Sequence, residues 1–294
     1  MLRFIDIRLG ESPGACTRCC GRVETLREAS GVLAEIAEVT SSWTTPLGPN
    51  LTLAGAEPFH HPALPDFIAA AVSGGAQRIR LDSDCHALAA PGSAVEAIQA
   101  GIRHVRFTLL GAESELHDAL FGQRGALERT LAGVRAFTEA ATAAKAPVHV
   151  TARVPVCRHN LQHVPATVTA AAEAGASAVL LSVEDAALDL RTAAPWLEAA
   201  CDTGIVNTVW VEVEGVPYGL AAGWELHLAS NYRHMAGTKT DRCSDCPLDD
   251  VCPGAVRGAS ADVVARFRPP GNAEIMQAGV RRAFAPPACD GILA

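Results

Sequence analysis

Short apolar runs alternate along most of this chain with alanine-rich stretches whose apolar residues recur at helical spacing. The runs with the length and composition of β-strands cover residues 2–9, 51–55, 78–82, 104–110, 147–156 and 178–183. The helical stretches between them cover residues 23–39, 64–73, 93–100, 126–144 and 164–174. Because strands that alternate with helices usually pair in parallel, this order predicts an α/β fold, either a doubly wound sheet or a partial barrel.

The pattern changes in the last third of the chain. A further strand is expected at 210–213, and residues 241–258 are dense in Cys, Asp, Pro and Gly. We therefore expect two parts, a β/α domain at 1–205 and a Cys-rich extension at 206–294.

Composition and charge narrow the class of protein. The chain has 294 residues, of which 49% are hydrophobic and 19% charged, so it can bury a large core. Its formal net charge is −8 and its basic residues are scattered, so no nucleic-acid partner is expected. No apolar run is long enough to cross a membrane, and the first residues alternate like a strand rather than a signal peptide. We therefore expect a cytoplasmic protein.

Six of the ten cysteines form two clusters. The first is Cys16, Cys19 and Cys20, in the loop after the first predicted strand, and the second is Cys243, Cys246 and Cys252. In a reducing cytoplasm, clustered thiols are typical of metal or iron–sulfur ligands rather than of disulfides. Both clusters are therefore candidate metal sites.

Three segments in the β/α part carry a family resemblance. The second predicted strand ends in a four-residue turn, Gly55, Ala56, Glu57 and Pro58. The strand at 104–110 is followed by His117 and Asp118, and the strand at 147–156 by Asn160 and Leu161. Together with the cysteine loop, these segments resemble, in order, the radical S-adenosylmethionine (SAM) superfamily over roughly the first 190 residues.

The resemblance implies a partial (β/α)6 barrel that binds SAM and an iron–sulfur cluster. It assigns Gly55, Ala56, Glu57 and Pro58 to the amino group of the methionine part of SAM. The chemistry agrees, because an ammonium group needs carboxylate and carbonyl acceptors, and small residues let the backbone approach closely.

The first cysteine cluster departs from the superfamily pattern. A [4Fe–4S] cluster of this type needs three thiolates, usually spaced Cys-x3-Cys-x2-Cys. Cys16 and Cys19 supply the closing pair, but Ser12 stands where the first Cys is expected. Three interpretations stay open: Cys16, Cys19 and Cys20 all bind the cluster, Ser12 or another group replaces one thiolate, or the site no longer cleaves SAM.

Two functional hypotheses follow from this departure. In the first, the chain is a radical SAM enzyme of a biosynthetic or maturation pathway, acting on a peptide or a small metabolite. In the second, it is a catalytically impaired homologue that serves as partner or substrate-binding subunit of an active radical SAM enzyme. Because Ser12 replaces the expected first Cys, the sequence does not decide whether the chain is an active enzyme or an impaired homologue.

The second cysteine cluster has the spacing Cys-x2-Cys-x5-Cys. It resembles the auxiliary-cluster regions of SPASM and twitch type, which implies a further iron–sulfur cluster held by Cys243, Cys246 and Cys252. A structural zinc site at the same three residues is the alternative. The candidates for a fourth ligand are Cys201, His234 and Cys289.

Polar residues near the ends of the predicted strands are expected at the carboxyl-end mouth, where β/α barrels bind ligands. They are Asp82, Asp84, Thr151, Arg153 and Glu184, candidates to contact substrate or the ribose of SAM.

Overall fold

The computed structural model describes residues 4–11, 25–44, 48–221, 223–228, 239, 241–246, 248–249, 252 and 254–255. Seven parallel strands form the main sheet: β1 (Phe4–Arg8), β4 (Asn50–Ala54), β5 (Arg78–Ser83), β6 (His104–Thr108), β7 (His149–Val156), β8 (Ala178–Val183) and β9 (Trp210–Glu214). Their order in the sheet is their order in the chain. A separate antiparallel pair joins β2 (Gly10–Glu11) to β3 (Thr25–Leu26). The predicted α/β fold with parallel strands is confirmed.

Helices connect the strands. They are α2 (Ala29–Ser41), α3 (Leu64–Ser73), α4 (Ser93–Gln99), α5 (Ser114–Phe121), α6 (Ala126–Ala143), α7 (Val164–Glu173) and α8 (Leu190–Val206). Short 3-10 turns are η1 (Pro58–His60), η2 (His86–Ala89), η3 (Leu161–His163), η4 (Tyr218–Leu220), η5 (Glu225–His227) and η7 (Asp241–Cys243). No helix within these described ranges combines the length and apolar character needed to span a membrane.

Two compact units divide the chain. One holds Leu2–Val154 and Ala166–Val179, and the other holds Pro155–Pro165 and the residues from Leu180 on. The predicted boundary near residue 205 stays a prediction.

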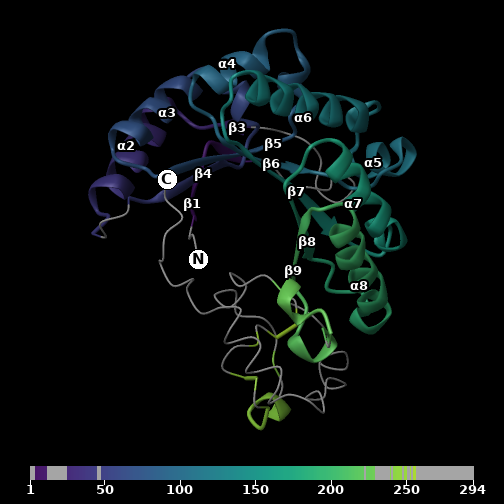
Figure 1. Ribbon diagram of the computed structural model, residues 1–294. Coiled ribbons are helices and arrows are strands. Elements are labelled where there is room, and N and C mark those ends of the chain that lie inside the picture. The colour runs from purple at the N-terminus through teal and green to yellow at the C-terminus, as the bar shows by residue number, and fades with distance from the viewer. Residues whose placement is uncertain are drawn as a thin grey trace. The chain divides into compact units, whose positions relative to one another are not determined.

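The core of the first unit follows from strand alternation. In β5, Ile79, Leu81 and Ser83 are buried, whereas the intervening residues are half-buried. The buried face lies toward α2, α3, α4 and α6, which cover one side of these strands (Figure 1). Phe67 and Phe107 are fully buried, and burial of each such ring contributes about 2–3 kcal/mol before conformational entropy is counted.

The helix α2 begins six residues later than the sequence pattern predicts. Thr25 and Leu26 pair as β3 with β2, so they cannot start a helix. Arg27 then donates from its main chain to the carbonyl of Leu9 and from Nη1 to the carbonyl of Arg8, at 2.8 and 2.7 Å. These contacts hold the chain extended up to Glu28, the N-cap of α2.

In the second unit, α8 packs its apolar side with η3, η4 and β9. Asp189 caps this helix by accepting a hydrogen bond from the N–H of Arg191 at 3.0 Å. Gly204 allows close approach to β9, because a Cβ there would lie 2.3 Å from the side chain of Val211.

Candidate SAM site at the end of β4

The turn after β4 is built on a close contact between two backbone segments. Gly55 has φ +99°, and a Cβ at this position would lie 2.3 Å from the carbonyl oxygen of Gly10. A side chain is therefore excluded by both conformation and space. Ala56 is buried beside Gly10, and Pro58 opens the turn η1. The four predicted residues thus form one turn at the carboxyl end of β4, the second strand of the sheet.

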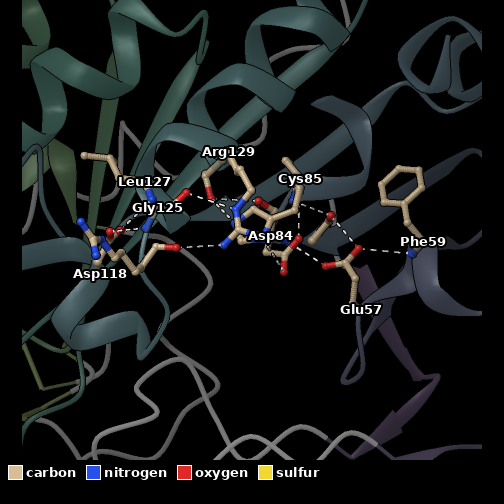
Figure 2. Close-up of polar contacts among 12 residues, drawn as sticks. Glu57, Phe59, Asp84, Cys85, Asp118, Gly125, Leu127 and Arg129 are labelled. Atoms are coloured by element: carbon tan, nitrogen blue, oxygen red, sulfur yellow. Dashed lines mark hydrogen bonds and ion pairs between the residues drawn. The ribbon is translucent and has the colours of Figure 1, made fainter. Parts of the chain in front are cut away.

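The carboxylate of Glu57 joins this turn to the end of β5. Its Oε1 accepts hydrogen bonds from the hydroxyl of Ser83 at 2.7 Å and from the N–H of Phe59 at 3.2 Å. Its Oε2 accepts from the N–H of Asp84 at 2.7 Å, as Figure 2 shows. Glu57 is only 6% exposed, so its buried side chain connects the carboxyl ends of β4 and β5.

Burial and the nearby charge of Asp84 raise the pKa of Glu57 to about 8, although its three hydrogen bonds act in the opposite direction. No cation among the described residues contributes to this shift. The turn therefore combines carbonyl acceptors, small residues and two neighbouring carboxyl groups. This set fits a positively charged amino group and offers nothing favourable to an anion.

Further contacts tie the loop after β5 to helix α6. The hydroxyl of Thr130 donates to the carbonyl of Asp84 at 3.0 Å and lies 3.0 Å from Nε2 of His86. A Cβ at Gly133 would lie 1.9 Å from the carbonyl oxygen of Cys85, so α6 touches this loop backbone to backbone. The loop after β5 is thus fixed by the hydrogen bond of Asp84 to Glu57 and by the contacts with α6.

Cys85 is not suited to act as a nucleophile. Its side chain is fully buried, and burial, followed by the charges of Glu57 and Asp84, raises the pKa of its thiol. Its φ of +63° is unusual for a residue with a side chain. We therefore interpret Cys85 as a structural residue of the loop after β5.

The pair His117 and Asp118 supports α6 rather than the mouth of the sheet. Asp118 accepts hydrogen bonds from the N–H of Gly125, the N-cap of α6, and from the N–H of Leu127 (Figure 2). His117 is fully buried and stacks on Phe121 with ring centroids 5.4 Å apart. Burial lowers the pKa of His117 to about 4, so the ring is neutral near pH 7.

The first cysteine cluster, Cys16, Cys19 and Cys20, lies outside the described residues, as does Ser12. Its assignment as a metal site stays a prediction.

Cys243, Cys246 and Cys252 are described and half-buried. The N–H of Cys246 donates to the carbonyl of Cys243 at 3.0 Å, and the N–H of Cys252 donates to the carbonyl of Leu248 at 2.7 Å. Burial raises the pKa of the Cys252 thiol. Within the described part of the chain, no three His, Cys, Asp or Glu side chains are grouped so as to hold a metal ion.

The candidates for a fourth ligand differ in position. Cys201 is buried inside α8, where burial raises the pKa of its thiol to about 12. His234 and Cys289 lie outside the described residues.

Strand alternation places the expected mouth residues. Asp82, Thr151 and Arg153 stand on the sheet face turned away from the helices. Asp84 directly follows β5 in the same unit. Glu184 belongs to the second unit, which holds the residues from Leu180 on. The sequence prediction missed Ser83, although its place on the buried side of β5 and the polar nature of its hydroxyl are readable in the pattern. It also missed Thr130, which no local pattern singles out.

No protein-family model and no curated protein matches this sequence. Solved structures do match. SuiB from Streptococcus suis bound to SAM is 13% identical with a TM-score of 0.61, covering 87% of this chain and 73% of that one. The protein anSMEcpe with bound AdoMet and Cp18Cys peptide is 10% identical with a TM-score of 0.57, covering 96% of this chain and 97% of that one.

These neighbours are radical SAM enzymes, and their fold is a partial β/α barrel. The chain therefore has the fold of radical SAM enzymes, as its sequence resemblance predicted.

Proposed function

We propose that this chain is a radical SAM-type protein that binds the amino group of SAM at Gly55, Ala56, Glu57 and Pro58. The observation that supports this most directly is the buried carboxyl of Glu57, which links the glycine turn at the carboxyl end of β4 to the end of β5. In an enzyme of this fold that edge is where a ligand binds.

The residues of the turn have separate tasks in this proposal. The carbonyl groups near Gly55 accept hydrogen bonds from the ammonium group, because Gly55 keeps the backbone free of side-chain atoms. Glu57 orients the turn through its bonds to Ser83, Phe59 and Asp84. Binding of the cation favours the ionised form of Glu57, and that negative charge, together with the charge of Asp84, stabilises the cation in a poorly solvated environment.

Cys16, Cys19 and Cys20 are the proposed ligands of a [4Fe–4S] cluster, which when bound would supply the electron for reductive cleavage of SAM. Cys243, Cys246 and Cys252 are the proposed ligands of an auxiliary iron–sulfur cluster, with zinc as the alternative. Elemental analysis for iron and zinc separates these two.

The proposed substrate is a peptide or a small metabolite, modified in a biosynthetic or maturation pathway of the cytoplasm. The support is the neighbour anSMEcpe, whose structure holds AdoMet together with a peptide.

Anaerobic reconstitution with iron and sulfide, followed by assay for 5′-deoxyadenosine, tests the proposal. The wild-type chain should form this product with a reductant, and a variant with Cys16, Cys19 and Cys20 replaced by Ala should lose both the product and the cluster iron. A matched Cys157→Ala variant should keep both. Absence of product and of SAM binding in the reconstituted wild type would overturn the proposal.

Ser12 favours a second candidate function. A chain lacking one thiolate would bind SAM weakly or not cleave it, and would serve as partner or substrate-binding subunit of an active radical SAM enzyme. Co-purification of a stable complex with such an enzyme, and product formed only in that complex, would support it. Full SAM cleavage by the isolated chain would exclude it.

A further inference from the structure

In the first unit, one face of the sheet is turned away from the helices (Figure 1), and the strand registers place polar and charged residues on it. Residues paired in register between parallel strands point to the same side of a sheet. The pairs Thr52–Arg80, Arg80–His104 and Asp82–Arg106 therefore identify this face. We refer to it as the inner face of β1, β4, β5, β6 and β7.

Positive charge outweighs negative charge on the inner face. Apart from histidines, its ionisable residues in these strands are five arginines and two aspartates: Arg8, Arg78, Arg80, Arg106, Arg153, Asp6 and Asp82. The whole chain has a formal charge of −8, so this excess is local. Like charges held together on a partly buried surface repel each other until an anion arrives, so the inner face favours a negatively charged ligand.

Arg80 is a largely buried donor of this group. Its Nη2 donates to the hydroxyl of Thr52 at 2.9 Å, and its guanidinium carbon lies 4.2 Å from the ring centroid of Phe4. Its Nε is buried and has no hydrogen-bond partner among the described residues. Burial and the charge of Arg106 lower the pKa of Arg80 to about 10. A buried N–H that lacks an acceptor is costly, and an incoming oxyanion would satisfy it.

Asp82 forms ion pairs with both Arg80 and Arg106, but its two oxygens are engaged at short distance by Arg106 alone. Nε of Arg106 donates to Oδ1 of Asp82 at 2.8 Å, and Nη2 of Arg106 contacts Oδ2. Nε of Arg80 is 3.6 Å from Oδ1, beyond hydrogen-bond distance. The side chains of Arg80 and Arg106 are 20% and 19% exposed, so a ligand in front of the sheet can reach both.

We propose that the inner face binds a carboxylate group of the substrate, with Arg80, Arg106 and Arg153 as the groups that attract and hold it. Arg153 stands one step nearer the carboxyl ends of the strands, beside Thr108. A carboxylate suits this place better than a phosphate, because Asp82 stands among the donors and repels the charge concentrated on one phosphate group more strongly than the single charge of one carboxylate group. An acidic side chain or the C-terminus of a peptide would supply the group. The assignment of this ligand as substrate rests on the proposed function.

Binding of succinate to the full chain, without added SAM or cluster, tests the proposal by titration calorimetry at constant ionic strength. Succinate should bind, its neutral diamide should not, and inorganic phosphate should bind no more tightly than succinate. Arg106→Gln should weaken succinate binding about tenfold, as loss of a charge-assisted contact does, whereas Asp82→Asn should strengthen it. Arg135→Gln, on the exposed surface of α6, should change nothing.

Equal binding of succinate and its diamide, unchanged binding in Arg106→Gln, or clear preference for phosphate would overturn the proposal. Arg153→Gln provides a second weakening variant if Arg106→Gln does not fold. Repeating the titration with saturating SAM separates two sources of carboxylate: displacement of succinate by SAM would assign the arginines to the cofactor and reject the substrate assignment. Failure of 5′-deoxyadenosine formation, by contrast, would reject the proposed function while leaving the carboxylate site standing.

Discussion

The main-chain N–H of Asp84 donates a 2.7 Å hydrogen bond to the buried carboxylate of Glu57, and this bond links the carboxyl ends of β4 and β5. A buried carboxyl in such a place makes stability depend on pH. Burial raises the pKa of Glu57 from 4.5 to about 8, so the folded chain holds this proton at pH values where the unfolded chain has lost it.

Glu57→Gln tests this dependence. Because the pKa is raised on folding, the contribution of Glu57 is fully present below pH 4.5 and is lost as pH rises towards 8, by up to about 5 kcal/mol. The variant cannot titrate, so its free energy of unfolding should fall less over this range. Urea unfolding between pH 5 and 8.5 measures it. The control Glu139→Gln, exposed on α6, should follow the wild type, and parallel curves for all three proteins would contradict the assignment.

For His117 we expect the opposite effect of pH on the free energy of unfolding, at acid pH. Burial lowers its pKa from 6.5 to about 4, with Asp118 acting against this and His86 adding to it. The unfolded chain therefore takes up a proton first, and stability is lost as pH falls from about 6.5 towards 4, by up to about 3 kcal/mol. His117→Phe, which keeps an aromatic ring beside Phe121, should flatten the loss in urea unfolding from pH 7 to 4.5. A variant as acid-sensitive as the wild type would show that other groups dominate.

Two helical glycines should respond oppositely to alanine. A Cβ at Gly133 meets the carbonyl oxygen of Cys85 at 1.9 Å, and backbone cannot move aside cheaply, so Gly133→Ala should lower the melting temperature markedly. A Cβ at Gly31 in α2 meets only the end of the Arg27 side chain at 3.9 Å, so Gly31→Ala should stabilise by up to about 1 kcal/mol. Thermal unfolding of the two variants measures both effects. A destabilised Gly31→Ala, or a neutral Gly133→Ala, would refute the packing described for these helices.

If the second cysteine cluster is a metal site, the purified chain should contain bound iron or zinc that depends on its three thiols. Replacing Cys243, Cys246 and Cys252 by Ala together should remove bound iron or zinc in a fixed ratio per chain, because thiolates are the proposed ligands. Elemental analysis and the visible absorption spectrum distinguish zinc from iron–sulfur. Cys157→Ala should leave the metal content unchanged. A triple variant that retains all its metal would reject the site.

The strands were predictable because each is a short apolar run between helical stretches. The predicted strand 178–183 and the predicted helix start at Leu64 agree with the structure to the residue. The helices α5 and α8 were not predicted. Pro195 inside α8 interrupts its apolar pattern, and the capping residue Asp189 was the signal available instead.

The candidate site was predicted in part. The Gly55–Pro58 turn can be read from sequence because its small residues and its carboxylate are adjacent. The hydrogen bonds that fix this turn cannot be read from sequence. Glu57 bonds to Ser83 and Asp84, which are more than 20 positions away and meet it only through the parallel pairing of β4 with β5. The arginine excess on the inner face depends on register in the same way.

The contact between Gly55 and the carbonyl of Gly10 has an evolutionary consequence. Gly10 and Glu11 lead directly into the segment that carries Ser12 and the first cysteines. A larger residue at either glycine would push Gly10 away from the turn after β4. In homologous chains the two positions should therefore covary, and lineages that lose one glycine should also relax selection on the thiols downstream.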